Sequence, residues 1–184
     1  GADAFYHGPI AADIVTGVNA TSTRQNNITF ADMAAYRARL RDSVCFEYRA
    51  YRVCGMGPPT SGGLTVGQIL GMLSNFEVAE MGWSAELAHL LGEVEKRAYA
   101  DRAMYMADSD FVPVPVEGLL DKEYLSTRAA EIDLNKAGAK AKAGIPPGAE
   151  QLKLAASLNP SNVGTSHFVI RDAYGNAISM TTTI

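Results

Sequence analysis

The chain has 184 residues, of which 47% are hydrophobic and 20% charged, and its formal net charge is −4. This composition fits one globular domain, or at most two small ones, and excludes a disordered chain. The negative charge argues against a nucleic-acid-binding protein, and no apolar run approaches the roughly 18 residues of a membrane span. Two Cys and three His show no ligand spacing, so we expect neither a metal nor a cofactor.

The N-terminal part predicts two helices. Between residues 5 and 23 apolar residues recur at helical spacing, at Ile10, Ile14, Val15 and Val18. A polar loop at residues 21–27 follows. Thr29-x-x-Asp32 then has the pattern of a capping box and predicts the start of the second helix.

A β-hairpin is predicted over residues 44–54, which are rich in aromatic and β-branched side chains. A turn at Arg49-Ala50 pairs Cys45 with Cys54 at a non-hydrogen-bonded position, where Cα atoms lie about 4.5 Å apart. That distance is at the short edge of the disulfide range. The two cysteines are therefore either bonded or free thiols packed as small apolar groups. A primed turn would require positive φ at Ala50.

The segment from Gly57 to Gly63 is rich in Pro and Gly, and we expect neither helix nor strand there. Its backbone N–H groups can cradle an anion, but it lacks the Lys of a phosphate loop. Close packing of the glycines is the favoured interpretation. Thr65-x-x-Gln68 is a second capping-box pattern and predicts a helix to about Phe76.

The strongest predicted helix covers residues 84–107. Its apolar residues form one stripe along the helix, made of Leu87, Leu90, Leu91, Val94 and Ala98. The charged residues Glu86, Glu93, Lys96 and Arg97 are predicted to lie outside this stripe. Near its end stand Asp101, Arg102, Asp108 and Asp110. These carboxylates can serve acid–base chemistry or a metal, but a structural ion-pair network of Asp101, Arg102 and Asp108 is favoured. His7 and His89 are interpreted as structural or surface residues.

The rest of the chain predicts a helix, then a low-complexity segment, then two strands. Asp121 is expected to cap a helix that reaches Ile132, and residues 136–150 form a low-complexity segment that predicts a mobile loop or linker. Residues 167–172 and 177–184 then predict two strands joined by a tight turn at Tyr174-Gly175-Asn176. The second strand has no turn or cap after it, so we expect it to belong to a longer protein.

Gly164-Thr165-Ser166-His167 is the candidate for nucleophilic chemistry. A Gly before a Thr that opens a strand suits a self-cleaving amidohydrolase precursor, because Gly permits a strained backbone and leaves its carbonyl open to attack. Cleavage would free the α-amine of Thr165, which can then activate its own hydroxyl. The alternative is an inert Thr at the start of a strand.

Together these segments resemble the γ-glutamyltranspeptidase family of N-terminal-nucleophile hydrolases. The resemblance rests on Ala4-Phe5-Tyr6-x-Gly8-x-Ile10-Ala11, Tyr48-Arg49-Ala50-Tyr51 with Met56-x-Pro58-Pro59-Thr60-Ser61-Gly62-Gly63, Ala98-Tyr99-Ala100-Asp101-Arg102-x-x-Tyr105-x-x-Asp108-x-Asp110-Phe111-Val112-x-Val114-Pro115, Thr165-Ser166-His167-Phe168, and Asp172-x-x-Gly175-Asn176-Ala177 with Thr181-Thr182-Thr183-Ile184. It covers nearly the whole chain except residues 136–160.

The resemblance implies an α+β fragment of an αββα fold, mainly helical with two β-hairpins. Self-cleavage would fall between Gly164 and Thr165, Thr165 would be the nucleophile, and Thr183 would orient its hydroxyl. The implied substrates are a glutathione-like γ-glutamyl donor and an amine or water acceptor. The implied location is periplasmic or extracellular. The other implied partner is the rest of the parent chain. Without it we expect an inactive fragment that associates with itself.

Three parts follow from this resemblance. They are residues 1–135, the later half of a large subunit; residues 136–164, a flexible linker before the cleavage site; and residues 165–184, the first strands of a small subunit. The family pattern is broken by Gly57 and Thr60 in the loop, Ala50 in the turn and Asn26-Asn27. These departures keep two alternatives open: a cephalosporin-acylase-like amidohydrolase and a non-catalytic helical binding fragment.

Overall fold

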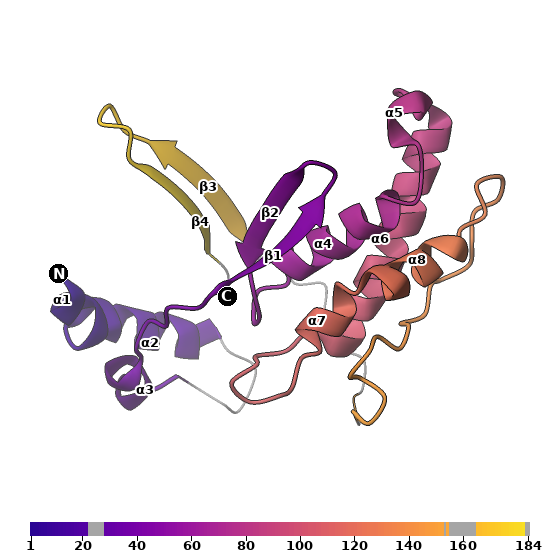
Figure 1. The fold of residues 1–184 in the computed structure, drawn as a ribbon. Coiled ribbons are helices and arrows are strands. Elements are labelled where there is room, and N and C mark those ends of the chain that lie inside the picture. The colour runs from indigo at the N-terminus through magenta and orange to yellow at the C-terminus, as the bar shows by residue number, and fades with distance from the viewer. Residues whose placement is uncertain (22–27, 153, 155–164, 183–184) are drawn as a thin grey trace. The chain divides into compact units, whose positions relative to one another are not determined.

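The computed structural model describes residues 1–21, 28–152, 154 and 165–182. In chain order the elements are α1 (Ala2–Tyr6), α2 (Pro9–Thr21), α3 (Phe30–Ala35), β1 (Ser43–Tyr48), β2 (Tyr51–Met56), α4 (Gly62–Leu73), α5 (Val78–Met81), α6 (Ala85–Tyr105), α7 (Val116–Leu119), α8 (Lys122–Ala130), β3 (Ser166–Arg171) and β4 (Ala177–Thr182) (Figure 1). They form two compact units, Gly1–Arg41 and Asp42–Ile184. The helices and two antiparallel hairpins confirm the predicted α+β class. Among the described residues, no helix combines the length and apolarity needed to cross a bilayer.

The first unit is a small helical cluster. Ala11 and Val15 of α2 pack with Met33 of α3 in its core. The predicted capping box at the start of α3 is confirmed, because Thr29 Oγ1 accepts from Asp32 N–H and the Asp32 carboxylate accepts from Thr29 N–H. The loop was predicted at residues 21–27; Thr21 is the last residue of α2, and residues 22–27 lie outside the described residues.

The hairpin of β1 and β2 has the predicted register, with Cys45 opposite Cys54 and Tyr48 opposite Tyr51. The turn differs in one respect from the expectation. Positive φ falls on Arg49, at 54°, and not on Ala50. A turn with positive φ at its first central residue alone also matches the twist of the strands, so Ala50 needs no Gly-like conformation.

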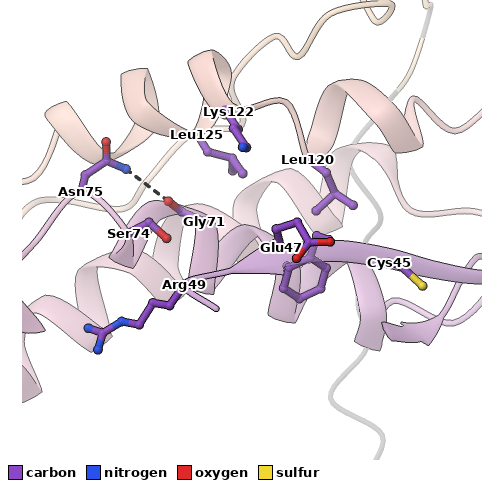
Figure 2. A pocket seen from close by; sticks show the side chains of 11 residues that line it. Cys45, Glu47, Arg49, Gly71, Ser74, Asn75, Leu120, Lys122 and Leu125 are labelled. Atoms are coloured by element: carbon purple, nitrogen blue, oxygen red, sulfur yellow. Dashed lines mark hydrogen bonds between the residues drawn. The ribbon is translucent and has the colours of Figure 1, made fainter. Parts of the chain in front are cut away.

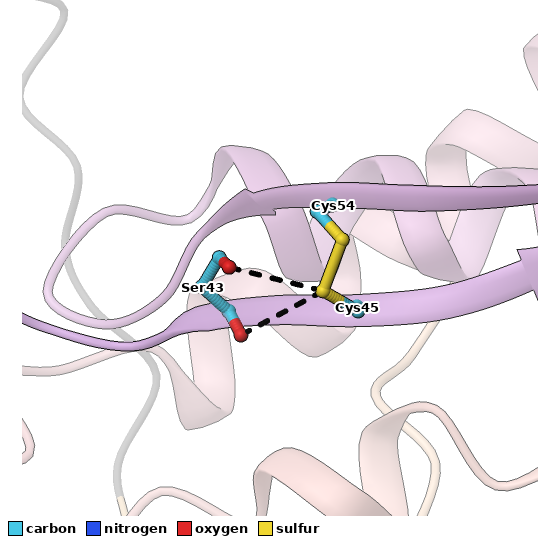
Figure 3. The surroundings of a disulfide bond; sticks show 3 residues. All are labelled: Ser43, Cys45 and Cys54. Atoms are coloured by element: carbon cyan, nitrogen blue, oxygen red, sulfur yellow. Dashed lines mark hydrogen bonds between the residues drawn. A yellow bond between two sulfur atoms is a disulfide. The ribbon is translucent and has the colours of Figure 1, made fainter.

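Cys45 and Cys54 form a disulfide across the hairpin (Figure 3). Their Cα atoms lie 4.1 Å apart, as expected for a non-hydrogen-bonded pair. The hydroxyl of Ser43 lies 3.8 Å from Cys45 Sγ and can donate to it. Of the two sequence interpretations, the structure shows the bonded one.

Helix α4 begins earlier than predicted. Its first residues are Gly62 and Gly63, and Ser61 is the N-cap residue, so Thr65 is the fourth residue of the helix and caps nothing. The reason is tertiary: an added Cβ on Gly63 would lie 2.6 Å from Met56 O. A helix that starts on glycines can therefore approach β2 closely. This confirms that the glycines of the Pro/Gly loop serve close packing.

Helix α4 contacts both α6 and α8, all three helices contribute to the main core, and both strands of the first hairpin contact α4. This core contains Met72 and Leu73 of α4, Leu90, Val94 and Ala98 of α6, and Tyr124, Leu125 and Ala129 of α8. The predicted starts of two helices are confirmed by capping hydrogen bonds. Ser84 accepts from Leu87 N–H and Asp121 accepts from Tyr124 N–H.

Helix α6 buries more than its apolar stripe. Glu93 and Arg97 were predicted to lie off the buried stripe, yet they are 3% and 7% exposed. With Asp101, which is 1% exposed, they recur every four residues and so share one face of the helix. The buried surface of α6 therefore has an apolar half and an ionic half. The prediction failed because the periodicity of apolar residues identifies only the apolar half of the buried surface.

The second hairpin pairs β3 with β4 in a register that places Ser166 opposite Thr182 and Arg171 opposite Ala177. The predicted turn is confirmed: Gly175 has a φ of 88°, which few residues other than Gly adopt without strain. Asp172 accepts hydrogen bonds from the N–H groups of Tyr174 and Asn176 and so closes the loop.

Candidate functional site

Thr165 lies directly before the first residue of β3, as the sequence predicts, and it is exposed. The two other predicted site residues, Gly164 and Thr183, lie outside the described residues. The geometry of the candidate site is therefore that of Thr165 and the hairpin that follows it.

One face of this hairpin carries a hydrogen-bonded polar group two residues after Thr165. His167 Nδ1 lies 2.8 Å from Thr181 Oγ1, and Ser179 Oγ lies 3.2 Å from His167 Nε2. A neutral imidazole has one N–H donor and one acceptor, whereas a hydroxyl can take either role, so both contacts can be satisfied. The two hydroxyl groups thus fix the orientation of the ring. Sequence reasoning missed Ser179 and Thr181 as its partners, although the register of the predicted hairpin would have identified both.

The other face of the hairpin is apolar. Its alternate positions hold Phe168, Ile170, Ile178 and Met180, which pair across the strands and are 39%, 57%, 49% and 44% exposed. Successive side chains of a strand point to opposite faces, so the polar group and the apolar patch are separated by the sheet itself. The hairpin therefore presents the His167 imidazole and the Thr181 and Ser179 hydroxyls on the face opposite to this apolar patch.

Of the carboxylates near the end of α6, Asp101 belongs to a structural network, but its partners are not the predicted Arg102 and Asp108; Asp108 accepts a hydrogen bond from Asp110 N–H instead. Asp101 accepts from Gln68 Nε2 at 2.9 Å, from the Tyr124 hydroxyl at 2.7 Å and from Gly144 N–H at 2.9 Å, and it pairs with Arg128 at 3.3 Å. Arg102 was the expected partner. The structure instead directs it to the Pro/Gly loop, where its Nε donates to Ser61 Oγ at 2.8 Å.

Burial dominates the ionisation of this network. Burial, followed by the hydrogen bond and the negative charge of Asp101, raises the pKa of the Tyr124 hydroxyl above its ordinary value. Burial and then the charge of Asp101 also raise the pKa of Tyr105. Both phenols therefore act as hydrogen-bond donors, not as bases. Within the described ranges, no three His, Cys, Asp or Glu side chains gather in a way that could hold a metal ion.

The two other histidines are structural, as the sequence suggested. His7 lies 3.2 Å from Asp3 on the first turns of the chain, and His89 Nε2 lies 2.9 Å from the carbonyl oxygen of Asp133. The first contact is local, whereas the second joins α6 to the chain that follows α8.

A pocket of about 500 Å³ opens between β1, α4 and α8 (Figure 2). Phe46 and Leu125 supply apolar walls, while Glu47, Arg49 and Lys122 bring charged groups to its edge. Its floor is flat because α4 carries Gly67 and Gly71 there, and an added Cβ would meet Leu120 at 2.5 Å or Leu125 at 2.4 Å. Its charged groups are exposed. The pocket thus offers a shallow surface without an activated nucleophile.

Comparison with known proteins places these features in a family. The sequence profile described as Gamma-glutamyltranspeptidase matches residues 1–184. The chain is 42% identical to the glutathione hydrolase proenzyme of Escherichia coli (strain K12) over 187 residues, covering 100% of this chain and 30% of that protein. It is 35% identical to the acylase ACY 1 proenzyme of Pseudomonas sp. (strain SE83) over 185 residues, again covering 100% and 30%.

The fold comparison agrees. The crystal structure of Helicobacter pylori gamma-glutamyltranspeptidase matches with a TM-score of 0.68 and 33% sequence identity, covering 88% of this chain and 44% of that one. The chain thus spans about a third of the length of the curated relatives that it matches.

Proposed function

Because the chain belongs to the gamma-glutamyltranspeptidase family, we propose that it is part of a γ-glutamyl transferase or hydrolase whose nucleophile is Thr165. The proposal concerns the whole protein, because the chain spans only 30% of the length of the curated relatives that it matches. The parent protein would have the αββα fold of N-terminal-nucleophile hydrolases. Residues 165–184 would then supply the first strands of its small subunit.

The nucleophile would be made by self-cleavage. Thr165 Oγ attacks the carbonyl carbon of Gly164, the peptide C–N bond breaks as an ester forms, and the hydroxyl proton passes to the released nitrogen. Water then hydrolyses the ester, leaving a carboxylate on Gly164 and a free α-amine on Thr165. Such an amine has an ordinary pKa of about 7.7–8.0 and can accept the proton of its own hydroxyl near neutral pH. The word proenzyme in the names of both curated relatives supports this step.

Turnover would use the same hydroxyl. Thr165 Oγ attacks the γ-carbonyl of a glutathione-like donor, the leaving amine takes a proton, and a γ-glutamyl ester remains on Thr165. Water or an amine then attacks the ester and releases the enzyme. Hydrogen-bond donors around the developing oxyanion would be needed in both halves of the reaction. We expect them from the part of the parent protein outside this chain.

One observation carries the proposal: the register of β3 and β4 pairs Ser166 with Thr182 and His167 with Thr181. Thr165 thus directly precedes a strand whose next inward pair joins an imidazole to a hydroxyl, His167 to Thr181. Thr183 is proposed as the residue that orients the nucleophile from its place in the Thr-x-Thr motif of the family alone.

A periplasmic or extracellular location is part of the proposal. The disulfide between Cys45 and Cys54 supports it, because disulfides persist in oxidising compartments.

A cephalosporin-acylase-like activity is the second candidate. The 35% identity to an acylase proenzyme favours it, and it uses the same nucleophile with another acyl group. The two candidates therefore differ in the acyl group that becomes attached to Thr165.

A covalent γ-glutamyl probe on the full-length protein tests the proposal. We expect mass spectrometry to find the γ-glutamyl adduct on the peptide that begins with Thr165, and we expect Thr165→Ala to be neither cleaved nor labelled. Thr165→Ser, which keeps a hydroxyl, is the matched control and should retain both reactions at a lower rate. A processed and active Thr165→Ala protein would contradict the proposal. An acyl adduct formed with a cephalosporin-type probe alone would support the second candidate.

A further inference from the structure

The first hairpin leaves one edge of β1 without a neighbouring strand, since within the described residues its sheet consists of β1 and β2. The Cα atoms of Cys45 and Cys54 lie 4.1 Å apart, which is the spacing of a non-hydrogen-bonded pair. Such pairs alternate with hydrogen-bonded ones, so Glu47 and Arg52, two positions along the ladder, form another. The backbone N–H and C=O groups of Cys45 and Glu47 therefore point away from β2, toward the open edge.

The pocket of about 500 Å³ lies along this edge, and we call it the β1 groove. Among the described residues, β1 and the turn after it contribute to its lining, whereas β2 contributes nothing. Figure 2 shows Lys122 and Leu125 of α8 on the side of the groove across from β1. The open edge of β1 is thus bordered by a hollow with a second wall, where a further segment of chain can lie.

The base of the groove is apolar. An added Cβ on Gly67 of α4 would lie 3.0 Å from the ring of Phe46, so this ring rests directly on the helix. Leu125, which is 3% exposed, rests in the same way on Gly71. A side chain that enters the groove from the open edge would meet these two apolar groups, and its burial there would be favourable if it is apolar itself.

The rim of the groove carries positive charge. The charge of Glu47 is balanced by the arginine opposite it in the ladder. Arg49 and Lys122 form no ion pair within the part of the chain that the structure describes. The acidic neighbours of Lys122 in the sequence, Asp121 and Glu123, line a different pocket. The rim therefore suits an occupant that brings an acidic side chain.

We propose that the β1 groove receives a β-strand from the part of the parent protein that lies outside residues 1–184. The chain spans 30% of the length of its curated relatives, so most of a parent of that size lies elsewhere, and natural proteins protect the open edges of their sheets. The incoming strand exchanges backbone hydrogen bonds with Cys45 and Glu47. It directs an apolar side chain toward Phe46 and Leu125 and an acidic one toward Lys122. This interface does not depend on the chemistry proposed for Thr165.

The test compares two proline variants of the full-length protein at one position of the ladder. Glu47→Pro removes the N–H that faces the groove. Arg52→Pro removes the N–H that faces the opposite edge of the hairpin and is the matched control. Neither N–H bonds β1 to β2, and a proline is tolerated at such positions of an edge strand. Glu47→Gln keeps the N–H and controls for the loss of the carboxylate.

The measurement is hydrogen exchange at single amides of β1, followed by mass spectrometry. In the wild type we expect the Cys45 amide to exchange as slowly as the Phe46 amide, which bonds to β2. Glu47→Pro should abolish the protection at Cys45 and leave it at Phe46, which shows that the hairpin itself is intact. Arg52→Pro and Glu47→Gln should keep the protection at Cys45.

The charge at the rim is tested in the same way. Lys122→Glu should speed exchange at Cys45, whereas Lys136→Glu, an exposed lysine outside the groove, should leave it unchanged. Fast exchange at Cys45 in the purified wild type would show a free edge and overturn the proposal. Protection that appears only after a separate protein or peptide is added would overturn it too, because the occupant would then not belong to the parent chain. So would protection at Cys45 that survives in Glu47→Pro.

Discussion

Among single residues, Thr165 carries the proposed chemistry and its neighbours prepare it. The ring of His167 is held by Thr181 and Ser179 on one face of the hairpin. Phe168, Ile170, Ile178 and Met180 form an apolar patch on the opposite face. A hydroxyl nucleophile needs a neighbour that fixes its orientation, and on the His167 face the neighbours are hydroxyl and imidazole groups.

Thr183→Ala should lower the rate of the full-length enzyme more than it lowers its stability. We propose that Thr183 holds the Thr165 hydroxyl by one hydrogen bond, worth about 0.5–1.5 kcal/mol. Loss of that bond corresponds to a decrease in kcat of roughly two- to tenfold. Kinetics and thermal unfolding of Thr183→Ala and Thr183→Ser measure the two effects side by side. Wild-type kcat in Thr183→Ala would remove Thr183 from the site.

The elements could be predicted from the sequence where the signals are local. The capping box at Thr29, the cap at Asp121 and the facing cysteines are all confirmed, because each depends on residues a few positions apart. The start of α4 at Gly62 could not be predicted, since it depends on contact with β2. The proposed nucleophile segment rests on its sequence motif, whereas the partners of His167 could be identified only from the strand register.

The buried ionic face of α6, formed by Glu93, Arg97 and Asp101, was not predicted from the sequence. Asp101 takes its partners from Gln68, Tyr124, Arg128 and Gly144, up to 43 positions away. No local pattern marks such partners, and a charged residue on a helix is interpreted as exposed by default. The ion pair with Arg102, one residue away, was predicted because it was close in sequence.

Glu93 on this face gives a pH-dependent prediction. Burial raises its pKa, but hydrogen bonds from Lys96, Arg97 and Gly138 outweigh burial and lower the pKa from 4.5 to about 2. A carboxyl with a lower pKa in the folded state stabilises the fold fully above its unfolded pKa. It loses that contribution as the pH falls from about 4.5 to about 2. The contribution is on the order of 3 kcal/mol.

We therefore expect Glu93→Gln to lower the melting temperature of the full-length protein at pH 7 and to lower it much less near pH 2. Melting curves across that range provide the measurement. Glu95→Gln, on the exposed side of the same helix, is the matched control and should leave the melting temperature at pH 7 close to that of the wild type. Parallel curves for Glu93→Gln and the wild type would show that Glu93 makes no such contribution.

At the scale of the whole molecule, the chain is one part of a larger enzyme by our account. It covers 30% of the curated relatives, and its second hairpin exposes four large apolar side chains on one face. A sheet of two strands is marginal by itself and is stabilised by further strands or by packing. The hairpin that carries Thr165 should therefore need the rest of the parent protein to become an active site.

Residues 1–184 expressed alone should accordingly be inactive, with the Gly164–Thr165 bond intact. An uncut Thr165 has an amide nitrogen, which is not basic, so its hydroxyl lacks the group that would activate it. Intact mass and a γ-glutamyl hydrolysis assay on the purified chain check both statements. The exposed apolar face should also cause self-association, visible in sedimentation. Release of product from a γ-glutamyl donor by this chain would show that it carries a complete site.

N-terminal sequencing of the purified full-length protein tests the central claim most directly. The claim is that one hydroxyl, that of Thr165, first cuts the chain and then serves as the nucleophile. Our account predicts two N-termini in the active protein, one of which begins Thr165-Ser166-His167. An active protein with a single N-terminus, or with a second one at any other residue, would contradict it.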